Sequence, residues 1–141
     1  MSEAAVEPGG VSDAALIAHA HGLINRRHLS PTVEVASVGA ALVTPSGAVY
    51  GGVNIDTSCS LGFCAEHSAI AAMIAAGESR IVTIVAVSER TGGGVVPPCG
   101  RCRELIWQVD PANHATRVLM GAGEAVLLQS LLPRHWRADW G

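Results

Sequence analysis

Two short stretches of this chain carry residues that could bind a metal ion and move a proton. Cys64 is followed two residues later by Glu66, and Cys99 is followed three residues later by Cys102. Three protein ligands with a fourth position open for water are typical of a catalytic zinc site. One turn at the start of a helix can present both Cys99 and Cys102 to one ion, and the positive end of that helix favours thiolate over thiol.

The carboxylate beside the first thiol need not be a metal ligand. On a helix turn, the side chain of Glu66 points away from the Cys64 sulfur, so the carboxylate is free to accept and return a proton. General acid–base catalysis of this kind is typically worth a factor of roughly a hundred to ten thousand in rate. Three thiolates leave a zinc site negatively charged, and His67, Arg101 and Arg103 are close enough in sequence to offset that charge.

Other interpretations of the cysteines stay open at this point. The pair Cys99 and Cys102 alone could be a redox or a structural motif. A closed zinc site with four thiolates, in which Cys59 joins the other three cysteines, is a sharper alternative. That alternative leaves Glu66 unexplained, so the catalytic interpretation is favoured.

Composition narrows the class of protein. The 141 residues are 49% apolar, which predicts a single folded domain over residues 1–141, with residues 1–11 as a loose N-terminal tail. The net charge is −3 and no lysine or basic run is present, which argues against a nucleic-acid polymer as partner. No apolar run is long enough for a membrane span, and no signal peptide is evident, so a cytoplasmic location with no membrane partner is expected. In that setting, four cysteines indicate metal binding or reactive thiols.

The elements that must position these residues follow from apolar periodicity and turn signals. We expect helices over residues 13–27, 64–76 and 100–109, strands over 33–43, 48–53, 81–87 and 117–120, and a last strand edge or helix over 126–132. Residues 54–62 and 89–98 are expected to be loops. This order predicts an α/β fold, a three-layer α-β-α sandwich with a mixed sheet of about five strands.

The two cysteine stretches resemble the motifs of the cytidine deaminase family. Cys64-Ala65-Glu66 and the run from Pro98 to Arg103 match the family's two metal motifs. Residues 38–42 resemble its first strand, residues 52–56 resemble its sugar-binding segment, and residues 131–136 are similar to its C-terminal aromatic motif. The all-cysteine ligand set resembles the branch that acts on free nucleosides.

The resemblance implies a role for particular residues. One zinc ion per chain would be bound by Cys64, Cys99 and Cys102, and Glu66 would shuttle protons. The backbone amide of Ala65 would hold the base edge together with Glu66. The resemblance further implies that Asn54 and Asp56 contact the ribose hydroxyls, and that Trp136 contacts the base in a neighbouring subunit. A homo-oligomer, and specifically a tetramer, is therefore expected.

Departures from the family pattern bear on the substrate. Asp56 stands where the family usually has Glu, and Ala36 stands where a base-packing Phe is usual. Blasticidin-S deaminases, which act on a cytosine nucleoside antibiotic, also lack that Phe. The first hypothesis is thus hydrolytic deamination of cytidine or deoxycytidine to the uridine form and ammonia, and the second is deamination of a modified or antibiotic cytosine nucleoside. The third hypothesis is a non-catalytic, zinc-stabilised binding domain, and the presence of Glu66 argues against it. A polynucleotide-editing deaminase is the least favoured hypothesis.

Overall fold

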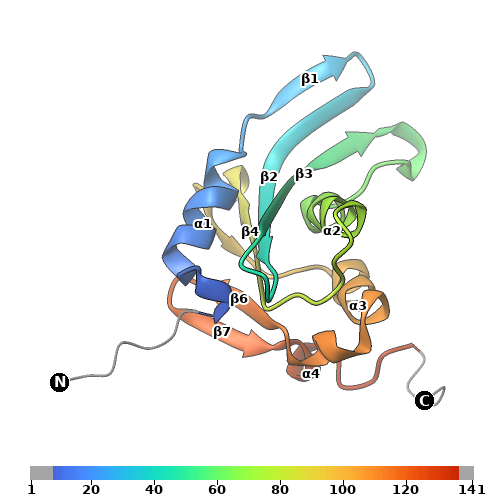
Figure 1. The fold of residues 1–141 in the computed structure, drawn as a ribbon. Coiled ribbons are helices and arrows are strands. Elements are labelled where there is room, and N and C mark those ends of the chain that lie inside the picture. Colours follow the sequence, from blue (N-terminus) through green and yellow to red (C-terminus); the bar gives the residue numbers. More distant parts are fainter. Residues whose placement is uncertain (1–7, 137–141) are drawn as a thin grey trace.

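The computed structural model describes residues 8–136 of the chain. Within that range four α-helices and seven strands alternate (Figure 1). The helices are α1 (Asp13–Gly22), α2 (Ala65–Ala75), α3 (Gly100–Val109) and α4 (Leu128–Leu131). The strands are β1 (Arg27–Ser30), β2 (Val33–Val43), β3 (Val49–Thr57), β4 (Thr83–Ser88), β5 (Gly94–Val96), β6 (Arg117–Gly121) and β7 (Glu124–Leu127).

All of these strands belong to one mixed sheet. Its main path runs β1-β2-β4-β6-β7, while β3 pairs with β2 and β5 pairs with β4. The pair formed by β4 and β6 is parallel and the others are antiparallel. The class predicted from the sequence is confirmed, but the sheet has seven strands rather than about five. The additional strands, β1 and β5, are short. The strand β5 lies in the expected loop 89–98, and β1 begins at Arg27, where the expected helix would still run, whereas α1 ends at Gly22. Backbone pairing with β2 and β4 forms these strands without any apolar alternation of their own.

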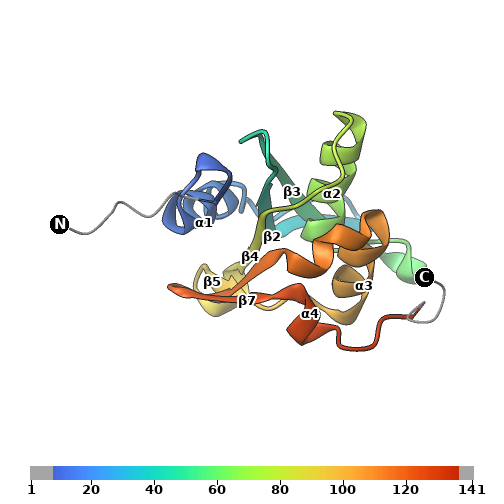
Figure 2. The same cartoon turned by 60° about the horizontal axis from the view of Figure 1, so that its bottom comes forward.

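The strand β2 separates two apolar layers. Ala40 and Leu42 belong to the core that includes α2 and α3, whereas Ala41 and Val43 belong to the core that includes Leu16 of α1. Successive side chains of a strand point to opposite faces, so one buried strand supplies both cores. Figures 1 and 2 accordingly show α1 on one side of the sheet and α2 and α3 on the other, which confirms the three-layer arrangement.

Helix α2 lies directly on β3, and a glycine makes this approach possible. A Cβ atom at Gly52 would lie 2.4 Å from the backbone nitrogen of Ala69, well inside contact distance. The strand β3 also runs through Thr57, so Asn54 and Asp56 lie on a strand and not in the expected loop, because Asp56 pairs with Glu34 of β2. The N-terminus of α2 is thereby held beside the end of β3.

The N-terminal segment is packed where the structure describes it. Val11 packs against the core around α1, and a Cβ atom at Gly9 would lie 2.7 Å from Cγ2 of Val43. Part of the expected tail, at Gly9 and Val11, thus lies against the core, and its residues 1–7 lie outside the described range. Within residues 8–136, no helix has the length and apolar character needed to cross a membrane.

Candidate active site

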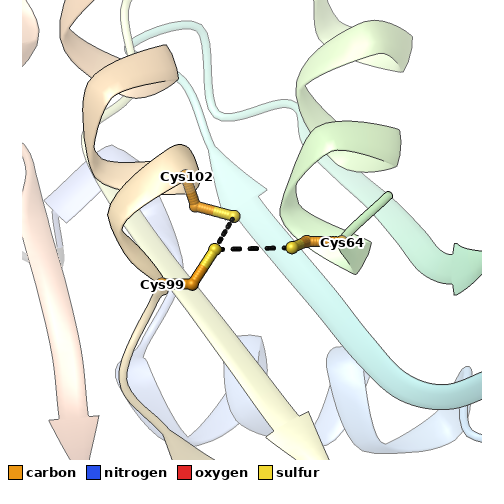
Figure 3. A group of neighbouring side chains, drawn as sticks. All are labelled: Cys64, Cys99 and Cys102. Carbon is orange, nitrogen blue, oxygen red and sulfur yellow. Dashed lines mark hydrogen bonds between the residues drawn. The ribbon is translucent and has the colours of Figure 1, made fainter. Parts of the chain in front are cut away.

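Three cysteine side chains meet where the N-termini of α2 and α3 converge (Figure 3). Cys64 is the N-cap of α2, Cys99 is the N-cap of α3, and Cys102 lies in the first turn of α3. The Sγ atom of Cys99 lies 3.5 Å from that of Cys64 and 3.5 Å from that of Cys102, and all three sulfurs lie within 4.8 Å of one another. Zinc–sulfur bonds of about 2.3 Å in a tetrahedron place the sulfurs roughly 3.8 Å apart. The three thiols are therefore positioned to hold a zinc ion.

Backbone contacts fix the two segments that carry the thiols. The backbone nitrogen of Phe63 donates to the carbonyl of Ile55, and that of Ile55 donates to the carbonyl of Phe63, each at 3.0 Å, so the residue before Cys64 is tied to β3. At the other segment, Nε of Arg103 donates to the carbonyl of Pro98 at 2.9 Å. Arg103, one of the residues expected to offset the site's charge, thus braces the turn before α3.

The fourth cysteine is outside this cluster. Cys59 is exposed and has a positive φ of 60° in a short turn, residues 58–60. Among the described residues, the group able to hold a metal consists of Cys64, Cys99 and Cys102. The closed site with four thiolates is therefore not the arrangement that the fold builds, and a fourth metal position remains for a non-protein ligand.

The thiols differ in their tendency to ionise. Burial opposes ionisation of Cys99, but hydrogen bonds from the backbone amides of Cys102 and Arg101 and from neighbouring thiols outweigh it and lower its pKa. Burial raises the pKa of Cys64, and burial followed by the Glu66 carboxylate raises that of Cys102. A bound cation would favour the thiolate form of all three, as metals do to coordinating thiols.

Glu66 lies in the first turn of α2, next to these thiols. Its side chain is buried, with 5% of its surface exposed, and it contributes to the wall of the cavity beside the cysteines. Burial raises its pKa, although hydrogen bonds from its own backbone amide and from Cys102 partly oppose this shift. A carboxyl group with a raised pKa beside a metal site is suited to accept and return a proton.

The cavity in front of these groups has a volume of about 510 Å³. Of the residues singled out from the sequence, it brings together Asn54, Asp56, Cys64, Ala65, Glu66 and Cys99 in its lining. Trp136 is not among the lining residues. Trp136 is 67% exposed, and its backbone nitrogen donates to Oε1 of Glu104 at 2.7 Å.

Asn54 and Asp56, both on β3, contribute to the wall of the cavity. The Nδ2 group of Asn54 donates to Oγ of Ser37 at 3.0 Å and to Oδ2 of Asp56 at 3.1 Å, and its Oδ1 accepts from the backbone nitrogen of Val38 at 2.8 Å. Ala36, which stands at the expected position of the base-packing Phe, is fully buried and does not line the cavity. Ser37 and Val38 line it instead.

Two arginines lie at the cavity, and one imidazole lies in the first turn of α2. Arg90 and Arg101 line the cavity, and neither has an ion-pair partner in the part of the chain that the structure describes. His67 stacks on Phe63 with ring centroids 6.4 Å apart, and burial together with the positive charge of Arg101 lowers its pKa. Because the lowered pKa leaves His67 largely neutral, it contributes little positive charge. Arg101 is therefore better placed than His67 to offset the negative charge of the thiolates.

Sequence reasoning missed Ser37, Val38 and Arg90 as cavity residues. A serine inside an otherwise apolar strand was a signal that could have pointed to Ser37, because a buried hydroxyl needs a partner. Arg90 had no such signal, since it lies in a glycine-rich segment without periodicity.

Comparison with known proteins agrees with this geometry. The family model described as the cytidine and deoxycytidylate deaminase zinc-binding region matches residues 12–118. The cytidine deaminase of Halalkalibacterium halodurans is 33% identical over 105 residues, which is 72% of this chain and 78% of that protein. The blasticidin-S deaminase of Bacillus cereus is 32% identical over 103 residues, covering 68% and 74%. The crystal structure of cytidine deaminase from Mycobacterium leprae superposes with a TM-score of 0.71 at 27% identity, covering 88% of this chain and 99% of that one.

An α-β-α sandwich that clusters three thiols beside a cavity lined by a buried glutamate has the arrangement of a zinc-dependent hydrolytic deaminase. With a family match over residues 12–118 and a cytidine deaminase at 33% identity over most of both chains, the chain belongs to the cytidine and deoxycytidylate deaminase family. It is therefore an enzyme that binds zinc and acts on the exocyclic amine of a cytosine compound.

Proposed function

We propose that this enzyme converts cytidine and deoxycytidine to uridine and deoxyuridine with release of ammonia. The observation that carries the proposal is the buried carboxyl group of Glu66 at the wall of the cavity, beside three clustered thiols. A site that only stabilised the fold would need no acid–base group at an open cavity.

Cys64, Cys99 and Cys102 are the proposed zinc ligands, with one ion per chain. Zinc bound in such a site lowers the pKa of water and so supplies a nucleophile near neutral pH. Glu66 would accept one proton from the attacking water and pass it to the ring nitrogen of the base, then take the second proton from the hydroxyl newly bonded to the ring carbon and deliver it to the amine, which leaves as ammonia as the carbonyl forms. The backbone amide of Ala65 and the carboxyl group of Glu66 hold the edge of the base in line with the attack.

The sugar is proposed to lie against Asn54 and Asp56. Asp56 is exposed on β3 and offers carboxylate oxygens to hydroxyl groups, while Asn54 is buried behind it with 7% of its surface exposed. The similarity to several cytidine deaminases in sequence and structure supports cytidine over an antibiotic nucleoside, so the blasticidin-type alternative is not favoured. The non-catalytic binding domain is disfavoured by the placement of Glu66.

The direct test is ammonia release by the purified, zinc-loaded protein from cytidine, deoxycytidine and free cytosine. Turnover of the two nucleosides, with much weaker use of free cytosine, is expected because a site that pairs a hydroxyl discriminates strongly against ligands without it. Equal use of cytosine and cytidine would contradict a sugar-reading role, and no turnover of any of them would refute the function.

The enzyme is further proposed to act as a homo-oligomer, specifically a tetramer. Large apolar side chains are exposed on the single chain, among them Leu61 at 77%, Ile74 at 51% and Trp136 at 67%. Burial of such residues between subunits is a common reason for oligomer formation. Trp136 does not line its own cavity, so we place it over the base in the cavity of a neighbouring subunit, where stacking is worth roughly 1–3 kcal/mol.

Trp136→Ala is expected to raise KM about fivefold or more while zinc content stays the same, because it removes base stacking only. Sedimentation at the assay concentration should give a tetramer for the unchanged enzyme. A fully active monomer would rule out the shared active site.

A cytoplasmic location is also proposed. All four cysteines are free thiols, and three of them are placed for a metal, a use of cysteine that a reducing compartment preserves.

A further inference from the structure

The strand β2 is interrupted beside the cavity by a bulge. Between the pairs Val35↔Ile55 and Gly39↔Val53, β2 advances four residues while β3 advances two. The chain therefore has two extra residues on β2 at this place. Ala36, inside the bulge, has φ of 64°, in the left-handed region that residues other than glycine rarely adopt. Bulges re-aim side chains, and this one turns Ser37 to the cavity.

The side chain of Asn54 holds this bulge in place. Its Oδ1 accepts a hydrogen bond from the backbone nitrogen of Val38 at 2.8 Å, and its Nδ2 donates to Oγ of Ser37 at 3.0 Å. Ser37 is 5% exposed and lines the cavity, so its hydroxyl is held in a fixed position at the wall. The side-chain amide of Asn54 thus supplies hydrogen bonds to the bulge, as the backbone of a neighbouring strand does in a regular β-ladder.

Of the side chains of Asn54, Asp56 and Ser37, one has a hydrogen that can still be donated to a ligand. An amide side chain has two N–H hydrogens, and those of Asn54 go to Ser37 and to Asp56. An ionised Asp56 can only accept. The Ser37 hydroxyl accepts from Asn54, and its own hydrogen has no acceptor among residues 8–136. Ser37 is thus the side chain of this trio with a hydrogen left to donate.

We propose that Ser37 binds the substrate and determines its specificity, by donating its hydroxyl hydrogen to a sugar oxygen whose own hydrogen is accepted by Asp56. This inference rests on the proposed function, and it narrows the substrates to cytosine nucleosides with a free hydroxyl on the sugar. Asn54 is then chiefly a positioning residue: it orients Ser37 and Asp56 and contributes the remaining lone pair of its carbonyl oxygen. A hydroxyl donor and a carboxylate acceptor side by side match a sugar hydroxyl, which both accepts and donates.

The test compares cytidine with 2′,3′-dideoxycytidine, which lacks both hydroxyls of the ring, in the full-length, zinc-loaded enzyme. In Ser37→Ala, the ratio of kcat/KM for cytidine to that for 2′,3′-dideoxycytidine should fall about three- to tenfold, the range expected for one neutral hydrogen bond to the substrate. Ser37→Thr keeps a hydroxyl and should restore most of the ratio. 2′-Deoxycytidine, which keeps only the 3′-hydroxyl of the two, identifies the oxygen. If Ser37→Ala lowers the ratio of kcat/KM for 2′-deoxycytidine to that for 2′,3′-dideoxycytidine by the same factor, the contact is to the 3′-hydroxyl.

Ser88→Ala is the matched control. Ser88 also lines the cavity and is 6% exposed, but its hydroxyl oxygen accepts from the backbone nitrogen of Arg90 at 3.2 Å and so serves the turn that follows β4. Loss of the Ser88 hydroxyl should change kcat/KM for both substrates by the same factor, so the ratio between them should stay the same. If Ser37→Ala lowers turnover of both substrates by the same factor, Ser37 has only a structural role and the inference is wrong.

Measurements of folding and of the unchanged enzyme's activity distinguish a misfolded variant, a wrong function and a wrong role for Ser37. Zinc content and the urea midpoint report whether Ser37→Ala folds; if it does not, Ser37→Cys, which keeps the size but is a weak donor, should show the same fall in ratio. An unchanged enzyme that deaminates none of these nucleosides refutes the proposed function itself. An active enzyme whose ratio is insensitive to residue 37 refutes only the inference about Ser37.

Discussion

Asn54 should matter to the stability of the fold as well as to the substrate. Asn54→Ala removes an amide that makes three hydrogen bonds: to Ser37, to Asp56 and from the backbone of Val38. Asn54 is buried, with 7% of its surface exposed, and Ser37 is 5% exposed, so water reaches the freed groups poorly. The change also leaves the strained bulge without the side chain that holds it.

The size of the effect follows from these contacts. A hydrogen bond contributes about 0.5–1.5 kcal/mol net, and a buried group left without a partner costs about 1–3 kcal/mol. Three lost bonds, with the Val38 amide and the Ser37 hydroxyl left unpaired, give an expected loss of about 2–4 kcal/mol in the free energy of unfolding. Against a typical total of about 5–15 kcal/mol, this is a large fraction.

Urea unfolding of the zinc-loaded enzyme, followed by circular dichroism, measures this loss. Asp56→Ala is the matched variant: it removes a neighbour on the same strand that is exposed and shares one of these bonds, so it should cost less than about 1 kcal/mol. Both variants should weaken use of cytidine. If Asn54→Ala is within 0.5 kcal/mol of the unchanged enzyme, the argument that its amide holds the bulge is refuted.

Three further outcomes are expected. Glu66→Gln should keep zinc and fold but lower kcat by roughly a hundred- to ten-thousandfold, since Gln has a similar shape and cannot shuttle a proton; near-normal ammonia release would rule out the proposed mechanism. Cys102→Ser should lose most of the bound zinc by metal analysis, whereas Cys59→Ser should keep it; zinc loss in the second variant would restore the site with four thiolates. Hydrogen bonds from Arg117 hold the pKa of Asp13 below its ordinary value of 3.8, against a smaller opposing effect of burial. Because the folded-state pKa is the lower one, this stabilisation is present above about pH 4 and disappears as the pH falls through the folded pKa. Asp13→Asn should therefore cost about 0.5–1 kcal/mol at neutral pH and nothing at the acid end, and a cost that is the same at pH 7 and pH 3 would contradict this assignment.

Local sequence patterns were sufficient for the elements that carry the chemistry. The strand at residues 33–43 and the helix at residues 100–109 were predicted with the bounds that the structure has. A mostly apolar run followed by a turn signal and a Cys-x-x-Cys stretch after two prolines are signals contained within a few residues. The helix after Cys64 was predicted for the same reason, and its end lies one residue before the predicted one.

The sequence by itself thus determined which residues could act together: Cys64, Glu66, Cys99 and Cys102 have types and spacings that fit one chemistry. The tertiary structure alone decided that Ser37 lines the cavity beside them. The bulge that turns Ser37 to the cavity arises from a mismatch in register between β2 and β3, which are joined by backbone pairing and by the amide of Asn54. Pairing between separate strands leaves no periodic trace in either strand. For that physical reason, the metal motifs and part of the cavity wall could be found in the sequence, whereas the position of Ser37 in that wall required the fold.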